Sequence, residues 1–145
     1  MVGAYKVDVS LNEHKQAVIS VGDKQIIADA AVAFGRTGEG MTPAELLIGA
    51  LGACQVIVAK LYAQKFDIDL QQISVELEGE SATVQDEKRI PTIKFKTHIE
   101  SNSPIDKVHK YLEFVEKNCV IGSTLKNEVV LVSEQVNVQP TVSSI

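Results

Sequence analysis

The 145-residue chain contains no tryptophan, three tyrosines, four phenylalanines and only two cysteines. Two cysteines cannot form the disulfide framework of a small secreted domain, and a chain of this length buries enough surface to fold without one. Basic residues are also scarce and scattered: 14 stand against 19 acidic residues, giving a net charge of -5. This balance argues against a nucleic-acid-binding protein and against a basic surface for membranes.

The sequence also lacks an uninterrupted apolar run of the roughly 20 residues that a membrane span requires. Its most apolar stretch, residues 46–59, is interrupted by Gln55 and followed by Lys60. The N-terminal residues alternate between apolar and polar and do not form the basic and apolar regions of a secretory signal. We therefore predict a cytoplasmic protein with a single domain over residues 1–145 and no membrane partner.

The pattern of apolar residues predicts an α+β fold. Alternation favours antiparallel strands that face water on one side, expected at residues 5–11, 16–21, 25–28, 73–79, 93–100 and 129–138. The pair Thr42-Pro43 is typical of a helix start and introduces a helix over residues 43–64. Ser103-Pro104 is expected to cap a second helix whose narrow apolar stripe leads towards Cys119.

The first predicted helix is apolar around most of its circumference, so it should be enclosed on several sides. A monomer of this size could hardly enclose it alone, which suggests a dimer. Gly49 and Gly52 lie inside this helix. Because glycine costs about 1 kcal/mol in a helix relative to alanine, these two positions suggest a packing or functional need, such as the approach of another backbone or of a ligand.

Cys54 and Cys119 lie on apolar faces, 65 positions apart in the sequence. The simplest interpretation is two buried side chains, because free cysteine is among the most buried residue types. In a reducing compartment they could instead be a transient redox pair. The small residues around Cys54 favour the second interpretation.

Two strings carry a resemblance to a known family. Residues 42–54 read TPAELLIGALGAC, and residues 119–125 read CVIGSTL. The first resembles the helix signature of the OsmC family, the osmotically inducible and organic hydroperoxide resistance proteins. The second is similar to the C-P-V-x-x-T-L motif that follows the second cysteine of that family.

The resemblance implies an intertwined homodimer in which antiparallel sheets wrap two central helices. It also implies that Cys54 attacks an organic hydroperoxide and becomes a sulfenic acid, and that Cys119 then forms a disulfide with it. Only a thiolate is a strong nucleophile towards peroxide, and a nearby second thiol protects the sulfenic acid from further oxidation. In related enzymes a small dithiol or a lipoylated protein serves as reductant. No cofactor or metal is implied.

The residues expected to activate the thiol depart from the family pattern. The family places a glutamate, which holds an arginine, ten residues before the first cysteine, and this position is Ala44 here. Glu45 is one residue closer, on the opposite face of the helix and about 13 Å along its axis from Cys54. Arg36, in the glycine-rich segment before the helix, is the candidate cation. Val120 replaces the motif proline, and Ser123 stands where a basic residue is frequent.

These departures keep a second hypothesis open: an OsmC-like binding or housekeeping domain, with weak or no peroxidase activity and an apolar ligand cleft at the dimer interface. The three histidines, His14, His98 and His109, do not have the spacing of a zinc helix, and we expect them at the surface. The alternating acidic residues Glu76 and Glu78 are interpreted as the solvated face of a strand.

Overall fold

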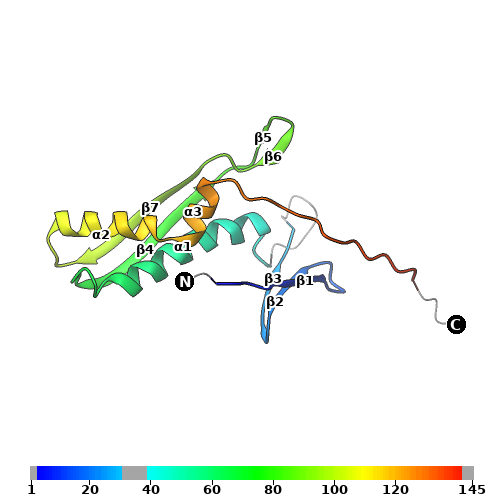
Figure 1. The fold of residues 1–145 in the computed structure, drawn as a ribbon, viewed down its shortest axis with the longest axis horizontal. Helices are drawn as coiled ribbons and strands as arrows, with labels where there is room; N and C mark the ends of the chain where they lie inside the picture. The colour runs from blue at the N-terminus through cyan, green and yellow to red at the C-terminus, as the bar shows by residue number, and fades with distance from the viewer. Residues whose placement is uncertain (1–2, 31–38, 142–145) are drawn as a thin grey trace.

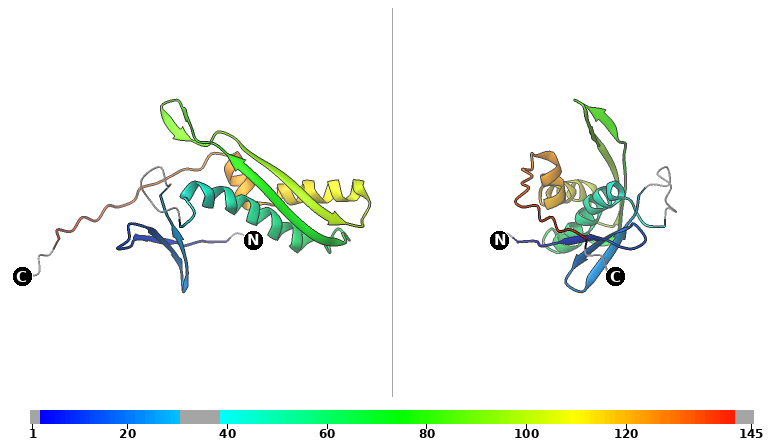
Figure 2. Two further views of the ribbon diagram at one scale, coloured as in Figure 1. Left: turned by 180° about the vertical axis from the view of Figure 1, so that it is seen from behind. Right: turned by 90° about the vertical axis from the view of Figure 1, so that its right-hand side faces the viewer.

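The computed structural model describes residues 3–30 and 39–141. Its central body is a pair of long antiparallel strands, β4 (Leu70–Gly79) and β7 (Ile93–Ser101), in which Val75 lies opposite Thr97. Helices α1 (Pro43–Tyr62), α2 (Ile105–Lys117) and α3 (Val120–Lys126) pack together on one face of this pair (Figures 1 and 2). The opposite face is polar and exposes Glu76 and Glu78, as the alternation predicted. The predicted α+β class is therefore confirmed.

A second sheet forms the N-terminal part of the chain and stands away from the helices (Figure 2). It is the predicted antiparallel meander of β1 (Asp8–Leu11), β2 (Ala17–Val21) and β3 (Lys24–Ala28). Gly22 provides the positive φ of 59° at the turn between β2 and β3. Apolar side chains of this sheet lie open to solvent: Val9, Leu11, Ile26 and Ile27.

Helix α1 starts with a complete capping box. The side chain of Thr42 accepts a hydrogen bond from the Glu45 N–H at 3.2 Å, and the Glu45 carboxylate accepts one from the Thr42 N–H at 2.9 Å. Pro43 occupies the first helical position, where its missing N–H costs nothing. The structure therefore confirms the predicted start of this helix, with Thr42 as the N-cap and Pro43 as the first helical residue.

Only one stripe of α1 is buried within the chain. It packs against β4, α2 and α3 through Leu51, Gly52, Gln55, Val58 and Ala59. Contrary to the expectation from the sequence, α1 is long and apolar enough to cross a membrane by length and composition alone, a test that a core helix also passes. In the structure, 28% of that window is buried. A Cβ atom at Gly52 would lie 2.6 Å from Leu77 Cδ1, so the close approach of β4 explains this glycine. Gly49 faces open space.

The core lies between the distal half of α1 and helix α2. Tyr111 is fully buried there and donates a hydrogen bond from its hydroxyl to the Ala59 carbonyl. Phe66 and Phe114 pack with ring centroids 4.8 Å apart beside it. This cluster fixes α2 against α1 and thereby sets the position of the residues that follow α2.

The structure contains one hairpin that the sequence pattern did not predict. The polar segment between β4 and β7 forms a hairpin of β5 (Ala82–Val84) and β6 (Glu87–Arg89), turned by Gln85 and Asp86 with positive φ angles of 52° and 64°. This turn contains no glycine, so the usual hairpin signal is missing.

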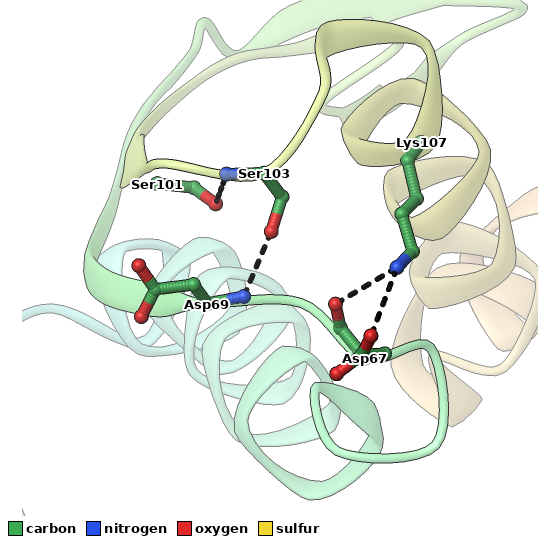
Figure 3. A network of polar contacts seen from close by, with 5 residues as sticks. All are labelled: Asp67, Asp69, Ser101, Ser103 and Lys107. Carbon is green, nitrogen blue, oxygen red and sulfur yellow. Dashed lines mark hydrogen bonds and ion pairs between the residues drawn. The ribbon is translucent and has the colours of Figure 1, made fainter.

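Ser103 does not cap α2 as expected. The N-cap position is Pro104, without a side-chain hydrogen bond to the helix. The Ser103 hydroxyl instead accepts a hydrogen bond from the Asp69 N–H at 2.9 Å, and Lys107 donates one to the Asp67 carbonyl at 3.0 Å (Figure 3). The serine therefore connects the start of β4 to the turn after β7.

The strand predicted at residues 129–138 is absent from the single chain. These residues are extended but carry no strand pairing, and the segment runs away from the body (Figure 1). Leu131 is 90% exposed and Val130 84% exposed. A strand requires a neighbour to pair with, and the described part of this chain places none beside these residues.

Candidate active site

Cys54 lies in the middle of α1, at the border between its buried and exposed faces. Residues three or four positions apart in a helix share a face. On one side of Cys54 are the buried Leu51 and Val58, and on the other is Ile57, which is 58% exposed. The Cys54 thiol itself is half-buried and touches the core cluster. The core thus holds Cys54, while its other side borders an apolar face that none of the described residues covers.

Cys119 lies at the junction between α2 and α3, where it is the N-cap residue of α3. Its side chain is 1% exposed. The sulfur accepts a hydrogen bond from the Gly122 N–H at 3.3 Å. A Cβ atom at Gly122 would lie 3.5 Å from both this sulfur and Leu51 Cδ1, so the glycine sits in the contact between α3 and α1.

The fold brings the two cysteines together across 65 positions of sequence. The two thiols are close enough for Cys54 to act on the ionisation of Cys119. Burial raises the pKa of the Cys119 thiol, and the neighbouring Cys54 raises it further. The backbone N–H groups of Gly122 and Ile121 lower this pKa, but by less. Cys119 is therefore protonated at neutral pH, and Cys54 is the more accessible of the two thiols.

The raised pKa of Cys119 predicts a pH dependence of stability. The unfolded thiol titrates near 8.5, so above about pH 8.5 the unfolded chain releases a proton that the folded chain retains. The free energy of unfolding should then fall with rising pH, by up to about 1.4 kcal/mol per pH unit, until the folded thiol also ionises. Urea unfolding of the reduced protein between about pH 7.5 and about pH 9.5 measures this slope.

Cys119→Ser provides the matched control, because its hydroxyl can still accept the Gly122 N–H but does not titrate in this range. The difference in slope between wild type and this variant isolates the thiol from all other groups. Equal slopes would contradict the assignment.

The structure does not bring Glu45 to Cys54. Glu45 lies in the first turn of α1, nine positions before Cys54. Hydrogen bonds with the backbone of Thr42, and to a lesser extent with the Thr42 side chain, lower the pKa of Glu45. Ala44, at the position of the family glutamate, has no group that could hold a cation. Arg36 lies outside the described residues.

A cavity of about 230 Å³ lies beside Cys119, between α1, α3 and β7. Its walls are mainly apolar and are formed by Leu51, Gln55, Ile90, Pro91, Ile93, Phe95, Glu116, Cys119, Gly122, Leu125 and Lys126. The larger depression of about 670 Å³ near the β5–β6 hairpin contains neither cysteine. The sequence did not point to Gln55 as a residue of this cavity. The one sign of it was an amide side chain within an otherwise apolar stretch.

The histidines lie at the surface, as expected, and His98 pairs with Glu76 at 2.8 Å. Within residues 3–30 and 39–141, no group of three or more His, Cys, Asp or Glu side chains is placed so that it could hold a metal ion. The described site therefore offers two thiols, the amide of Gln55, the charged groups of Glu116 and Lys126, and otherwise apolar walls.

Comparison with known proteins gives a consistent family result. The model of the OsmC-like protein family matches residues 36–134. No curated protein matches the chain.

Among solved structures, an OsmC-like protein from Mycoplasma pneumoniae is 24% identical, with a TM-score of 0.79 over 87% of this chain and 89% of the other. An organic hydroperoxide resistance protein OsmC from Legionella pneumophila is 12% identical, with a TM-score of 0.69 over 86% and 92%. A further organic hydroperoxide resistance protein, from Elizabethkingia anophelis, is 12% identical, with a TM-score of 0.69 over 87% and 91%. At these identities the structures establish a shared fold.

Proposed function

Because the chain belongs to the OsmC-like protein family, we propose that it is a thiol-dependent peroxidase that reduces organic hydroperoxides through Cys54 and Cys119. The observation that carries this proposal is the position of the two cysteines: Cys54 packs against the core from the middle of α1, and Cys119 lies at the start of α3, where α3 meets α1. At this separation Cys54 acts on the ionisation of Cys119. The organic hydroperoxide resistance proteins among the structural relatives support the substrate class.

The two thiols divide the reaction into two steps. The Cys54 thiolate attacks the terminal oxygen of R–O–O–H, the O–O bond breaks, and the alkoxide takes up a proton and leaves as the alcohol. Cys54 is then a sulfenic acid. The Cys119 sulfur attacks the Cys54 sulfur, a disulfide forms and water leaves. The pair has given up two electrons, which an external dithiol or a lipoylated protein would restore by thiol–disulfide exchange.

The difference in burial between the thiols supports this division of roles. Cys54 is half-buried and can be reached by a peroxide, whereas Cys119 is 1% exposed and meets oxidant only through Cys54. A buried, protonated thiol is a poor first nucleophile, because the thiolate is the reactive form. Cys119 is well suited to the second step, because Cys54 lies close enough to act on its ionisation.

We assign Arg36 as the cation that stabilises the Cys54 thiolate, with Glu45 as the acidic residue available to hold it. Glu45 is ionised by its hydrogen bonds at the helix start and can pair with a cation. Because Ala44 replaces the family glutamate, this activation has to use a different geometry from that of the family pattern.

We further propose that the working unit is an intertwined homodimer in the cytoplasm. The uncovered face of α1 carries Leu47, Ile57 and Leu61, of which Leu61 is 69% exposed, and Cys54 lies at its edge. A second subunit on this face would exclude water from the thiol. The extended residues 129–138 would then supply a strand to the partner.

Titration of the reduced protein with an alkyl hydroperoxide tests the proposed activity. One equivalent of tert-butyl hydroperoxide per chain should remove both thiols and yield the disulfide and one equivalent of tert-butanol, because the two sulfurs supply the two electrons. Free thiols are counted with a chromogenic disulfide, and the bond is identified by peptide mass spectrometry. Survival of both thiols in millimolar oxidant would exclude the peroxidase.

In that case the second candidate, a binding domain, is favoured by Ala44 and by the cavity of about 230 Å³. Such a protein would bind an apolar ligand next to thiols that do not turn over.

A further inference from the structure

The cavity of about 230 Å³ lies beside one cysteine of the pair and not beside the other. Among the residues that the structure describes, its lining includes Cys119 but not Cys54. Cys54 is half-buried at the border of the uncovered face of α1. The two sulfurs are therefore approached from different sides, and the cavity gives an approach to the more deeply buried one.

The sulfur of Cys119 lies against the part of the cavity wall that Gly122 forms. It accepts the Gly122 N–H at 3.3 Å and is 3.5 Å from the position that a Cβ atom at Gly122 would take. Leu51 Cδ1, on another part of the wall, is also 3.5 Å from that position. Both separations are ordinary van der Waals contacts, so glycine leaves an atom-sized space in contact with the sulfur.

Helix α3, which carries Gly122, is a weakly held wall. It has seven residues, and none of them is buried. A helix this short is marginal by itself, and a segment with few buried contacts opens at low free energy. A small outward shift of α3 would therefore widen the space beside the sulfur enough for a larger atom.

The lining of the cavity favours a compact, uncharged, apolar molecule. Leu51, Ile93 and Phe95 supply apolar walls, and the charges of Glu116 and Lys126 have opposite signs. The volume of about 230 Å³ exceeds the roughly 150 Å³ that holds benzene in an engineered apolar cavity. A short hydrocarbon chain that carries thiols fits this description.

We infer that this cavity is the entry site of the reductant, where the thiolate of a compact, uncharged, apolar dithiol attacks the Cys119 sulfur of the Cys54–Cys119 disulfide. The inference rests on the proposed function, which supplies that disulfide. A bond forms between the reductant and Cys119, and Cys54 leaves as a thiolate and takes up a proton. The second thiolate of the reductant then attacks its own first sulfur, so that Cys119 leaves, takes up a proton, and a cyclic disulfide departs.

The chemistry of the leaving group agrees with this choice of sulfur. In thiol–disulfide exchange a thiol with a lower pKa leaves faster. Burial raises the pKa of the Cys119 thiol, so expulsion of Cys119 in the first step would be slow. Attack on Cys119 expels Cys54 instead and does not form the buried thiolate while the protein disulfide is being broken.

The attacked sulfur is identified on a disulfide that is made without peroxide. Diamide oxidises the two thiols of the wild type, and butanethiol then serves as an apolar reductant with a single sulfur. After an acid quench and alkylation, peptide mass spectrometry locates the mixed disulfide, which we expect predominantly on Cys119. A mixed disulfide mainly on Cys54 would overturn the inference, as would failure of diamide to join the two cysteines.

Gly122→Ala tests the path through the cavity, because its methyl group fills the space beside the sulfur. The rate at which butanedithiol reduces the disulfide should fall by about tenfold or more. Alkylation of Cys54 by iodoacetamide in the reduced variant should proceed at the wild-type rate, since Cys54 does not line the cavity. Alanine is favoured over glycine in a helix, so the variant should fold with a Tm no lower than that of the wild type.

Ser123→Ala is the matched control, because it introduces the same residue at the next position of α3, which is exposed and does not line the cavity. It should leave the rate of reduction as in the wild type. Equal rates of reduction in Gly122→Ala and the wild type would overturn the inference. So would an equal loss of rate in Ser123→Ala.

The two oxidants separate this inference from the proposed function. If the diamide-made disulfide is attacked at Cys119 but an alkyl hydroperoxide does not form that disulfide, the peroxidase proposal fails and the entry site stands. If the hydroperoxide forms the disulfide but butanethiol attacks Cys54, the entry site fails and the peroxidase proposal stands.

Discussion

Cys54→Ser should abolish hydroperoxide reduction, with a loss of at least about 1,000-fold, in the range seen when nucleophiles are removed from other enzymes. A serine hydroxyl is not ionised near neutral pH and cannot attack the O–O bond. The remaining Cys119 cannot take over, because its side chain is 1% exposed and burial raises the pKa of its thiol. The rate of alcohol formation from tert-butyl hydroperoxide, with dithiothreitol as reductant, measures the loss.

Cys119→Ser is the informative counterpart, because it retains Cys54 and removes the second step only. This variant should still consume the first equivalent of peroxide at a rate similar to that of the wild type. Its sulfenic acid, without a resolving thiol, should then be oxidised to the sulfinic acid by excess peroxide, which mass spectrometry detects as two added oxygens. If instead Cys119→Ser were inert and Cys54→Ser active, the roles of the two cysteines would be reversed.

The elements that the sequence predicted correctly are those determined by local chemistry. The pair Thr42-Pro43 identifies the start of α1 without reference to the rest of the chain, and the structure adds a capping box with Glu45. The alternation of apolar and polar residues likewise predicts the antiparallel pair of β4 and β7, because one face of that pair is covered by helices and the other is wet.

The features that the sequence could not predict depend on contacts between distant residues. The approach of Cys119 to Cys54 follows from the docking of α3 on α1, and only the family resemblance suggested it. The role of Ser103 depends in the same way on a partner 34 positions away, Asp69. Gln55 was visible only as an interruption in an apolar run, because burial and the lack of a donor are properties of the folded chain.

Residues 129–138 have the alternating sequence pattern of a strand, but no neighbouring strand pairs with them in the described part of the chain. Four even-numbered positions carry valine and form an apolar face that Glu134 interrupts; the odd-numbered positions from 133 to 137 are polar. The valines are Val130, Val132, Val136 and Val138. In the single chain Val130 is 84% and Val138 85% exposed. Such a face is stable only when it is covered, which leads to the proposed exchange of this segment between two subunits.

Introducing charges on that face should separate the subunits. The double substitution Val130→Asp and Val132→Asp places two carboxylates where the strand would be buried against a partner, at a cost of several kcal/mol for each uncompensated charge. Dimer affinity should therefore fall by at least about 100-fold. Sedimentation equilibrium should give twice the chain mass of 15.7 kDa for the wild type and the single mass for the variant.

The control adds the same two charges to the polar face of the same segment, through Ser133→Asp and Asn137→Asp. Because these positions alternate with the apolar ones, their side chains point away from the covered face, and the control should remain dimeric. Peroxide consumption should follow the assembly state, since the uncovered stripe of α1 borders Cys54 and a lost partner admits water to the thiol. If the wild type sediments as a single chain, two proposals fail: the exchange of residues 129–138 between subunits, and the covering of Cys54 by a second subunit.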